Sequence, residues 1–264
     1  MSYTSPALEG AYIVNDAVVV AQARELGTGY ESRDWAAAPL GTFATPMPID
    51  TIPRSEWADR IEAMDQAKAW PKDHKILSGF PSLDQARTNF CWANAPIACC
   101  HYVRAASGKP HVPLSPASIA APIKNYKNKG GWGSQALKYL INNGAVPQSL
   151  WPANEINRNL DNDTSRQARK DYRVTEWWEL DEGNFDQLAT CLFMGYPVAI
   201  GLNWWGHEVT AVQLLTKDGE YFTDIDNSWG GWGDNGHGIL TEQKSTADDQ
   251  VAARVLTPDR GEYA

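Results

Sequence analysis

The sequence predicts an α+β fold, because helix-like segments come first and strand-like segments dominate from residue 172 onward. A length of 264 residues with 43% hydrophobic residues is enough for one large core, or for a two-lobed domain with a cleft. Residues 1–52 differ, since they carry short apolar runs, Gly and Pro punctuation and no strong periodicity. We therefore expect an extended N-terminal arm over residues 1–52 and a folded domain over residues 53–264.

The helices are predicted from their start and stop signals. Ser55 is a suitable N-cap for a helix over 55–68. A helix that follows Cys91 is expected to end at 107–110, where Gly and Pro occur. The remaining expected helices start at 115, shortened by Pro122, and cover 134–142 and 185–194.

The strands are predicted from β-branched and aromatic runs between turn residues. They are expected over 172–179, 197–203, 207–215, 221–226, 238–242 and 251–256. Residues 217–219 contain a Gly and form a hairpin signal between two of these runs. The strands should therefore pair mainly antiparallel.

Four residues occur in the order that a thiol hydrolase needs. Gln85 would serve as an oxyanion donor, Cys91 as the nucleophile, His207 as the base and Asn227 as the group that orients the base. Each residue alone could have a purely structural role, for example as a small thiol in the core or as a hydrogen-bonded imidazole. Their combination and order favour nucleophilic catalysis.

The neighbours of these residues resemble those of papain-like cysteine peptidases. Gln85 stands six residues before Cys91, and Trp and Ala follow the Cys directly. Leu114-Ser115, Gly130-Gly131, Gly206-His207 and Asn227-Ser228-Trp229-Gly230 then match the family's segments in order, over roughly residues 53 to 258. The resemblance implies a two-lobed fold, with a helical left lobe, an antiparallel β right lobe and the active cleft between them.

The chain departs from the usual family pattern at several positions. Thr88 stands where secreted members usually have a disulfide-forming Cys, and the arm lacks the long charged helical pattern of the family's propeptide. We expect a divergent member without the usual propeptide or disulfides. The arm is expected to dock on a neighbouring subunit, with a removable pro-region as the alternative.

Catalysis by Cys91 requires a lowered thiol pKa. A free thiol has a pKa of about 8.5, and a helix N-terminus with an adjacent imidazolium lowers it to roughly 3.5 to 7.5. Cys91 is expected on the first turn of its helix, at the positive end of the macrodipole. Gln85 would join the Cys91 backbone N–H in binding an oxyanion. Pro96 should kink this helix and shift the nucleophile slightly.

The predicted hairpin brings His207 and Asn227 together. The Asn227 carbonyl would accept the imidazole N–H and fix its tautomer. The resemblance implies that Trp229 shields this bond from water. It also implies that Gly130 and Gly131 bind substrate backbone.

Two further residues are expected to contact substrate. Trp132 would wall a side-chain pocket. Glu208 stands after the base, where a small residue is common in the family, so it would repel acidic side chains, favour basic ones, or raise the imidazole pKa.

Composition excludes other classes of function. The net charge of −9 disfavours nucleic-acid binding. The four cysteines lack the pattern of a disulfide framework or a zinc site, so we expect neither metal nor cofactor. No apolar span long enough for a membrane occurs, and no signal peptide is recognisable. A cytoplasmic location, or an intracellularly assembled particle such as a virion, is expected. Paired Trp residues at 177–178 and 204–205 are each expected to leave one ring exposed for a protein partner.

Three functions remain open at this point. The leading one is hydrolysis of peptide bonds through a Cys91 thioester. The alternative is a papain-fold structural component of a larger assembly, such as a virion, with weak or no peptidase activity. A third is amide hydrolysis or acyl transfer on a non-peptide substrate, which uses the same residues.

Overall fold

The computed structural model describes residues 3–74 and 77–256. In this part of the chain one mixed sheet of seven strands has the order β1-β2-β7-β3-β4-β5-β6. All neighbours pair antiparallel except β1 and β2, which are parallel. The strands are β1 (Thr45–Pro46), β2 (Val174–Glu179), β3 (Val198–Leu202), β4 (His207–Lys217), β5 (Glu220–Asp226), β6 (His237–Thr241) and β7 (Asp249–Leu256). The ends of the predicted arm and domain, residues 1–2 and 257–264, lie outside the described residues.

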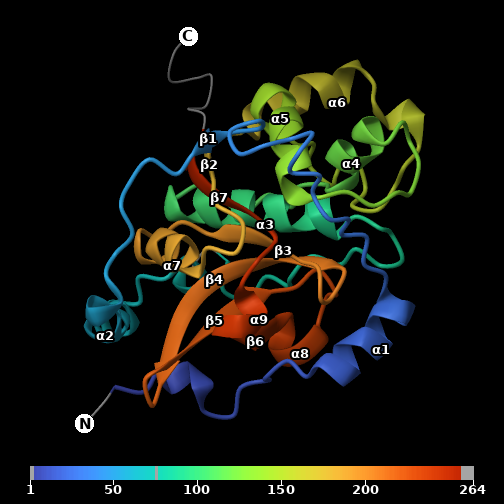
Figure 1. Ribbon diagram of the computed structural model, residues 1–264. Coiled ribbons are helices and arrows are strands. Elements are labelled where there is room, and N and C mark those ends of the chain that lie inside the picture. The colour runs from blue at the N-terminus through green and yellow to red at the C-terminus, as the bar shows by residue number, and fades with distance from the viewer. Residues whose placement is uncertain (1–2, 75–76, 257–264) are drawn as a thin grey trace.

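Helix α3 crosses the middle of the molecule between the other left-lobe helices and the long strands of the right lobe (Figure 1). The α-helices within the described residues are α1 (Asp16–Leu26), α2 (Trp57–Ala67), α3 (Cys91–Ala106), α4 (Ala117–Ile123), α5 (Gly133–Asn143), α6 (Asp163–Ala168), α7 (Phe185–Phe193), α8 (Trp232–Asn235) and α9 (Glu242–Ser245). The α+β prediction is confirmed, and the predicted helices and strands after residue 54 agree with the structure to within a few residues at their ends.

Two large hydrophobic cores form because the sheet is apolar on both faces. Along β3, Val198 and Ile200 belong to the core that also contains α2 and α7, whereas Ala199 between them belongs to the core around α3, α4 and α5. This alternation follows from the two-residue period of a strand. The two cores give the molecule two lobes, and α3 packs along their boundary.

Helix α3 remains one helix from Cys91 to Ala106 although Pro96 lies inside it. Pro96, which was predicted to kink this helix, does not interrupt it. Every residue from Cys91 to Ala105 is buried, so packing from both lobes holds the helix despite the hydrogen bond that Pro96 cannot donate. Cys91 is the first residue of the helix, as predicted.

The N-terminal arm lies along the body of the same chain. The sequence predicted no regular structure there, yet residues 16–26 form helix α1, which Asn15 caps by accepting from the N–H of Ala17. Ser5 bonds strand β4 at Thr216, and Val19 is fully buried in the core. The arm is thus largely packed on the right lobe before it reaches the cleft.

The paired tryptophans are less exposed than predicted. Trp177 and Trp178 are both buried, because the two faces of β2 are both covered by the cores. Trp205 is buried as well, and Trp204 is half-buried against Lys244. Neither pair therefore leaves one fully exposed ring, contrary to the prediction.

Candidate active site

Cys91 lies where the first turn of α3 meets the other lobe. Its side chain is fully buried. The backbone amides of Glu208, Trp92 and Tyr30 each act to lower the pKa of the thiol. The amide of Trp92 belongs to the helix N-terminus, whereas that of Glu208 comes from β4, directly after His207. The fold therefore brings the sulfur to the His207 segment, although the two residues are far apart in the sequence.

His207 and Asn227 form the contact that the hairpin predicted. Asn227 Oδ1 accepts from His207 Nε2 at 2.8 Å, and both residues are buried. The contact arises because β4 and β5 pair next to it, with Thr210 opposite Asp226. The ring of Trp229 lies 4.6 Å from that of His207 and tilted by 31°, so it covers the imidazole. His207 Nδ1 is buried and has no hydrogen-bond partner among the described residues.

Gln85 is held firmly with its amide donor directed at the cleft. Its Oε1 accepts from Ser228 Oγ at 2.6 Å, which fixes the orientation of the side-chain amide. Its Nε2 then donates to the carbonyl of Thr88 and to the carbonyl of Thr28, at 2.9 and 3.0 Å. Thr28 belongs to the N-terminal arm. An arm carbonyl thus accepts from the amide that was predicted to bind an oxyanion.

Residues 27–31 of the arm lie between segments of the two lobes. Tyr30 pairs with Gly131 in a parallel bridge, in which Gly131 donates to the carbonyl of Gly29 and accepts from the N–H of Glu31. The N–H of Tyr30 donates to the carbonyl of Gly206, and the indole of Trp229 donates to the carbonyl of Gly27. Segments from both lobes therefore hold the arm by its backbone.

The buried ring of Tyr30 lies against Gly201, and other glycines leave room for the arm backbone and for Glu208. A Cβ atom at Gly201 would collide with the Tyr30 ring, and a Cβ at Gly130 would lie 2.5 Å from the carbonyl of Gly29. Gly133 similarly leaves room for the carboxyl of Glu208. The Tyr30 hydroxyl is buried without a hydrogen-bond partner among the described residues. The predicted segment Gly130-Gly131 thus contacts a peptide backbone, here that of the arm.

The surroundings of Cys91 favour its neutral thiol form. Burial raises the pKa of the Cys91 thiol well above its ordinary value, and the nearby Glu208 carboxyl raises it further. Burial lowers the pKa of His207 to about 4, against the effect of its bond to Asn227. Both groups are therefore neutral at pH 7. The alternative that Glu208 raises the His207 pKa is wrong, because burial lowers this pKa and Glu208 is not among the groups that shift it.

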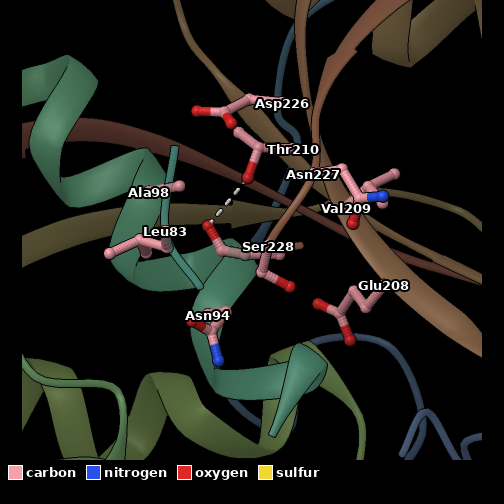
Figure 2. A pocket seen from close by; sticks show the side chains of 10 residues that line it. Leu83, Asn94, Ala98, Glu208, Val209, Thr210, Asp226, Asn227 and Ser228 are labelled. Carbon is pink, nitrogen blue, oxygen red and sulfur yellow. Dashed lines mark hydrogen bonds between the residues drawn. The ribbon is translucent and has the colours of Figure 1, made fainter. Parts of the chain in front are cut away.

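Glu208 is buried rather than exposed to a substrate groove. Burial raises the pKa of its carboxyl well above the ordinary value, and its Oε2 has no partner among the described residues. Figure 2 shows this side chain pointing from β4 toward α3, near Asn94 and Ser228. The cavity that these residues line measures about 10 Å³, room for one water molecule at most. Trp132 lies half-buried nearby on the left lobe, where the Lys124 ammonium is 5.9 Å from its ring.

Two features of the arm had no clear signal in the sequence. One is the buried ring of Tyr30. The other is Arg33, whose buried guanidinium joins Glu179 and Asp249. The described part of the chain holds no cluster of three or more His, Cys, Asp or Glu side chains that suits a metal ion, and all four cysteines are free thiols. No helix within the described ranges is both long and apolar enough to span a bilayer.

Solved structures share this fold, whereas no protein-family model and no curated sequence matches the chain. Xylellain, a cysteine protease from Xylella fastidiosa, is 19% identical with a TM-score of 0.63, over 88% of this chain and 97% of that one. Digestive procathepsin L2 proteinase from Tenebrio molitor is 18% identical with a TM-score of 0.68, over 94% and 86%. Bromelain from Ananas comosus, solved with the inhibitor E64, is 19% identical with a TM-score of 0.54, over 67% and 94%.

These similarities establish the fold. The chain has the two-lobed α+β fold of papain-like cysteine proteases. The site at the boundary of its lobes holds a thiol, an imidazole paired with an amide, and a second amide directed at the cleft.

Proposed function

We propose that the protein is a cysteine peptidase that hydrolyses peptide bonds through a Cys91 thioester. The observation that carries the proposal is the hydrogen bond of 2.8 Å between His207 Nε2 and Asn227 Oδ1, which the pairing of β4 with β5 brings about. His207 directly precedes Glu208, whose backbone amide lowers the pKa of the Cys91 thiol. Asn227 holds Nε2, which leaves Nδ1 of the same ring without another partner among the described residues. That nitrogen is the one available to take the thiol proton.

The proposed reaction uses the side chains of Cys91, His207 and Gln85. His207 Nδ1 takes the proton of Cys91, and the sulfur attacks the carbonyl carbon of a bound peptide. The oxyanion binds at the Gln85 amide, a type of interaction whose removal typically costs about 3 to 4 kcal/mol of transition-state stabilisation. His207 then gives its proton to the leaving amine. Water attacks the thioester with His207 again as base, and Cys91 recovers its proton.

The described form is proposed to be latent. The arm occupies the cleft, and both reacting groups are neutral there. The Cys91 sulfur interacts with the backbone amide of Tyr30, whereas the Gln85 amide donates to the carbonyl of Thr28. The nucleophile and the oxyanion donor therefore contact different peptide groups of the arm. An occupant held in this way blocks the site without being cut. Procathepsin L2 matches 94% of this chain, so its similarity must reach into residues 1–52.

Peptide hydrolysis by a variant that lacks residues 1–31 tests this proposal. We expect this variant to cleave fluorogenic peptides and the full-length chain to be at least tenfold slower. Cys91→Ala should abolish the activity. Cys99→Ala is the matched control, since Cys99 is an equally buried thiol on the same helix but lies two turns from its N-terminus, and it should retain activity. Activity that survives Cys91→Ala would refute the assignment.

The other two functions are left with less support. The similar solved structures named above are proteases, and nothing supports docking of the arm on another subunit or a role in a virion. Amide hydrolysis or acyl transfer on a non-peptide substrate would use the same residues. A panel of peptide and non-peptide amides offered to the shortened variant separates the two chemistries. The free thiols suit a reducing compartment, which we retain as a proposal.

A further inference from the structure

Arg104 is a buried cation without a counter-ion among the described residues. It lies in the last turn of α3 and is only 7% exposed. Its Nε atom has no hydrogen-bond partner, and none of the ion pairs within the described residues includes its guanidinium. Charged side chains are almost never fully buried unless they are paired. The guanidinium of Arg104 therefore has unused capacity to bind an anion.

Two other arginines show the usual arrangements. Arg33 is buried, but its guanidinium lies 2.9 Å from Glu179 and 3.0 Å from Asp249. Arg54 also bridges two carboxylates, and its side chain is 44% exposed. Burial without a charged partner thus distinguishes Arg104 from both.

The ring of Tyr172 does not replace an anion at Arg104. The central guanidinium carbon lies 4.8 Å from the centre of this ring, so the aromatic face covers one side of the guanidinium. The N–H groups of a guanidinium point outward in its plane, and they bind the two oxygens of a carboxylate or a phosphate. The contact with the ring therefore leaves the anion-binding edge of Arg104 unoccupied by any described residue.

The recess around Arg104 contains a second cation and no acidic side chain. Lys109, His101 and His111 line it with Arg104, and its remaining lining residues are apolar. Burial lowers the pKa of both imidazoles, that of His101 to about 3, and the charge of Arg104 lowers them further. Both rings are therefore neutral at pH 7, and a neutral imidazole donates one N–H. The recess thus combines positive charge with additional hydrogen-bond donors.

A cavity of about 520 Å³ adjoins this recess. Leu77, His101 and His111 line both spaces, so the two meet at the imidazoles. Small-molecule sites usually measure about 300 to 1,000 Å³. The ring of Phe80, which also lines the cavity, is 51% exposed and packs on His111 with 4.0 Å between ring centres. The cavity therefore offers an apolar surface beside the recess.

Charged groups elsewhere in the cavity wall have partners or face solvent. Asp226 accepts from a tyrosine hydroxyl at 2.8 Å, and Lys72 pairs with Asp224. Asp84 is exposed. The buried charge that lacks a partner is that of Arg104, so the ligand that complements this region is negatively charged.

We propose that Arg104, His101 and His111 form a binding site for an organic anion, whose carboxylate or phosphate group binds Arg104 and whose apolar body lies in the cavity along Phe80. The recess is closely packed, so the anionic group takes the end of the cavity beside the imidazoles. Arg104 turns toward it without losing a hydrogen bond to any described residue. Helix α3 rises about 20 Å from residue 91 to residue 104, so the site is separate from the candidate active site and independent of the proposed peptidase activity.

Titration of the full-length protein with matched ligands at pH 7, followed by NMR of its five ¹⁵N-labelled histidines, tests the proposal. Benzoate and phenyl phosphate carry the two head groups, and benzamide and benzylamine are the neutral and cationic controls. We expect the anions to shift the signals of His101 and His111, but not that of His207, and to bind at least tenfold more tightly than the controls. The tighter anion identifies the head group.

Two results of this titration would overturn the proposal. One is binding of benzylamine or benzamide as tight as that of both anions. The other is a shift at His207 in place of His101 and His111. Inorganic phosphate tests the role of the cavity, since it should bind more weakly than phenyl phosphate, and equal affinity would refute a ligand body packed along Phe80.

Arg104→Met tests the arginine itself. This variant should bind the preferred anion at least tenfold more weakly, the loss expected for charge-assisted hydrogen bonds. Arg169→Met is the matched control, because Arg169 is 11% exposed and lies 5.5 Å from a tyrosine ring but has the Asp161 carboxylate at 3.8 Å. It should bind as the parent does. Unchanged affinity in Arg104→Met, or an equal loss in Arg169→Met, would contradict the assigned site.

Discussion

Replacing Arg33 by Met should strongly destabilise the fold. The substitution keeps an unbranched stem of similar length but removes the cation between Glu179 and Asp249. It also removes the donors to Ser134 and to the carbonyls of Ala38 and Pro39. Two buried carboxylates would then have to be protonated or hydrated, and either change opposes folding.

The expected magnitude follows from the burial of the pair. Removing one partner of a buried ion pair typically costs about 3 to 5 kcal/mol, because the remaining charge is left without compensation. With a urea slope of roughly 3 kcal/mol per molar, this corresponds to a fall of about 1 to 2 M in the unfolding midpoint. An exposed pair contributes only about 0 to 1 kcal/mol. The two classes of arginine are thus well separated.

Urea unfolding at pH 7, followed by tryptophan fluorescence, measures the difference. The Arg33→Met midpoint should fall by the amount given above, and that of Arg54→Ala should stay within about 0.3 M of the parent. Adding Glu179→Gln and Asp249→Asn to Arg33→Met should recover part of the loss, since no unpaired charge then remains. A cost below about 1 kcal/mol for Arg33→Met would refute the reasoning.

Three further outcomes are expected. The melting temperature of Glu208→Gln minus that of the parent should increase as pH rises from 4.5 to 8. The pKa of Glu208 is raised in the folded state, so its stabilising contribution is lost as pH rises through that value. A difference in melting temperature that does not change with pH would contradict this. Tyr30→Ala in the full-length chain should speed labelling of Cys91 by a peptidyl thiol reagent about tenfold or more, because the space of the Tyr30 ring becomes free. Tyr3→Ala is the control and should not change the rate. Equal labelling rates in the two variants would argue against blocking of the site by Tyr30. Asn227→Ala in the shortened variant should lower kcat by about 10- to 100-fold, part of the 10²–10⁴ that a positioned base contributes, and a kcat equal to that of the parent would remove Asn227 from the site.

Local signals in the sequence predicted most of the fold and the placement of the candidate site. The Gly and Pro at 107–110 marked the end of α3, and the hairpin at 217–219 set β4 against β5 so that His207 meets Asn227. Such signals act within a few residues of the element that they define, so sequence patterns detect them well.

The role of the arm was not predictable in this way. Arg33 lies 146 residues from Glu179 and 216 residues from Asp249, and no periodic pattern links them. The close approach of the arm likewise depends on glycines from separate segments, since Gly130 lies against the carbonyl of Gly29 and Gly201 against the Tyr30 ring, and the two share no local motif. Helix α1 was missed because its apolar residues are largely exposed, so they form no clear stripe. Tertiary contacts of this kind become visible only in coordinates.

Mass-spectrometric mapping of the variant lacking residues 1–31, after brief reaction with a peptidyl epoxide or vinyl sulfone, tests the central claim most directly. We predict modification of Cys91 alone among the four cysteines, at a rate that falls at least tenfold in the His207→Ala form. Labelling of Cys99, Cys100 or Cys191 in preference to Cys91, or a rate that does not depend on His207, would contradict a thiol activated by that imidazole.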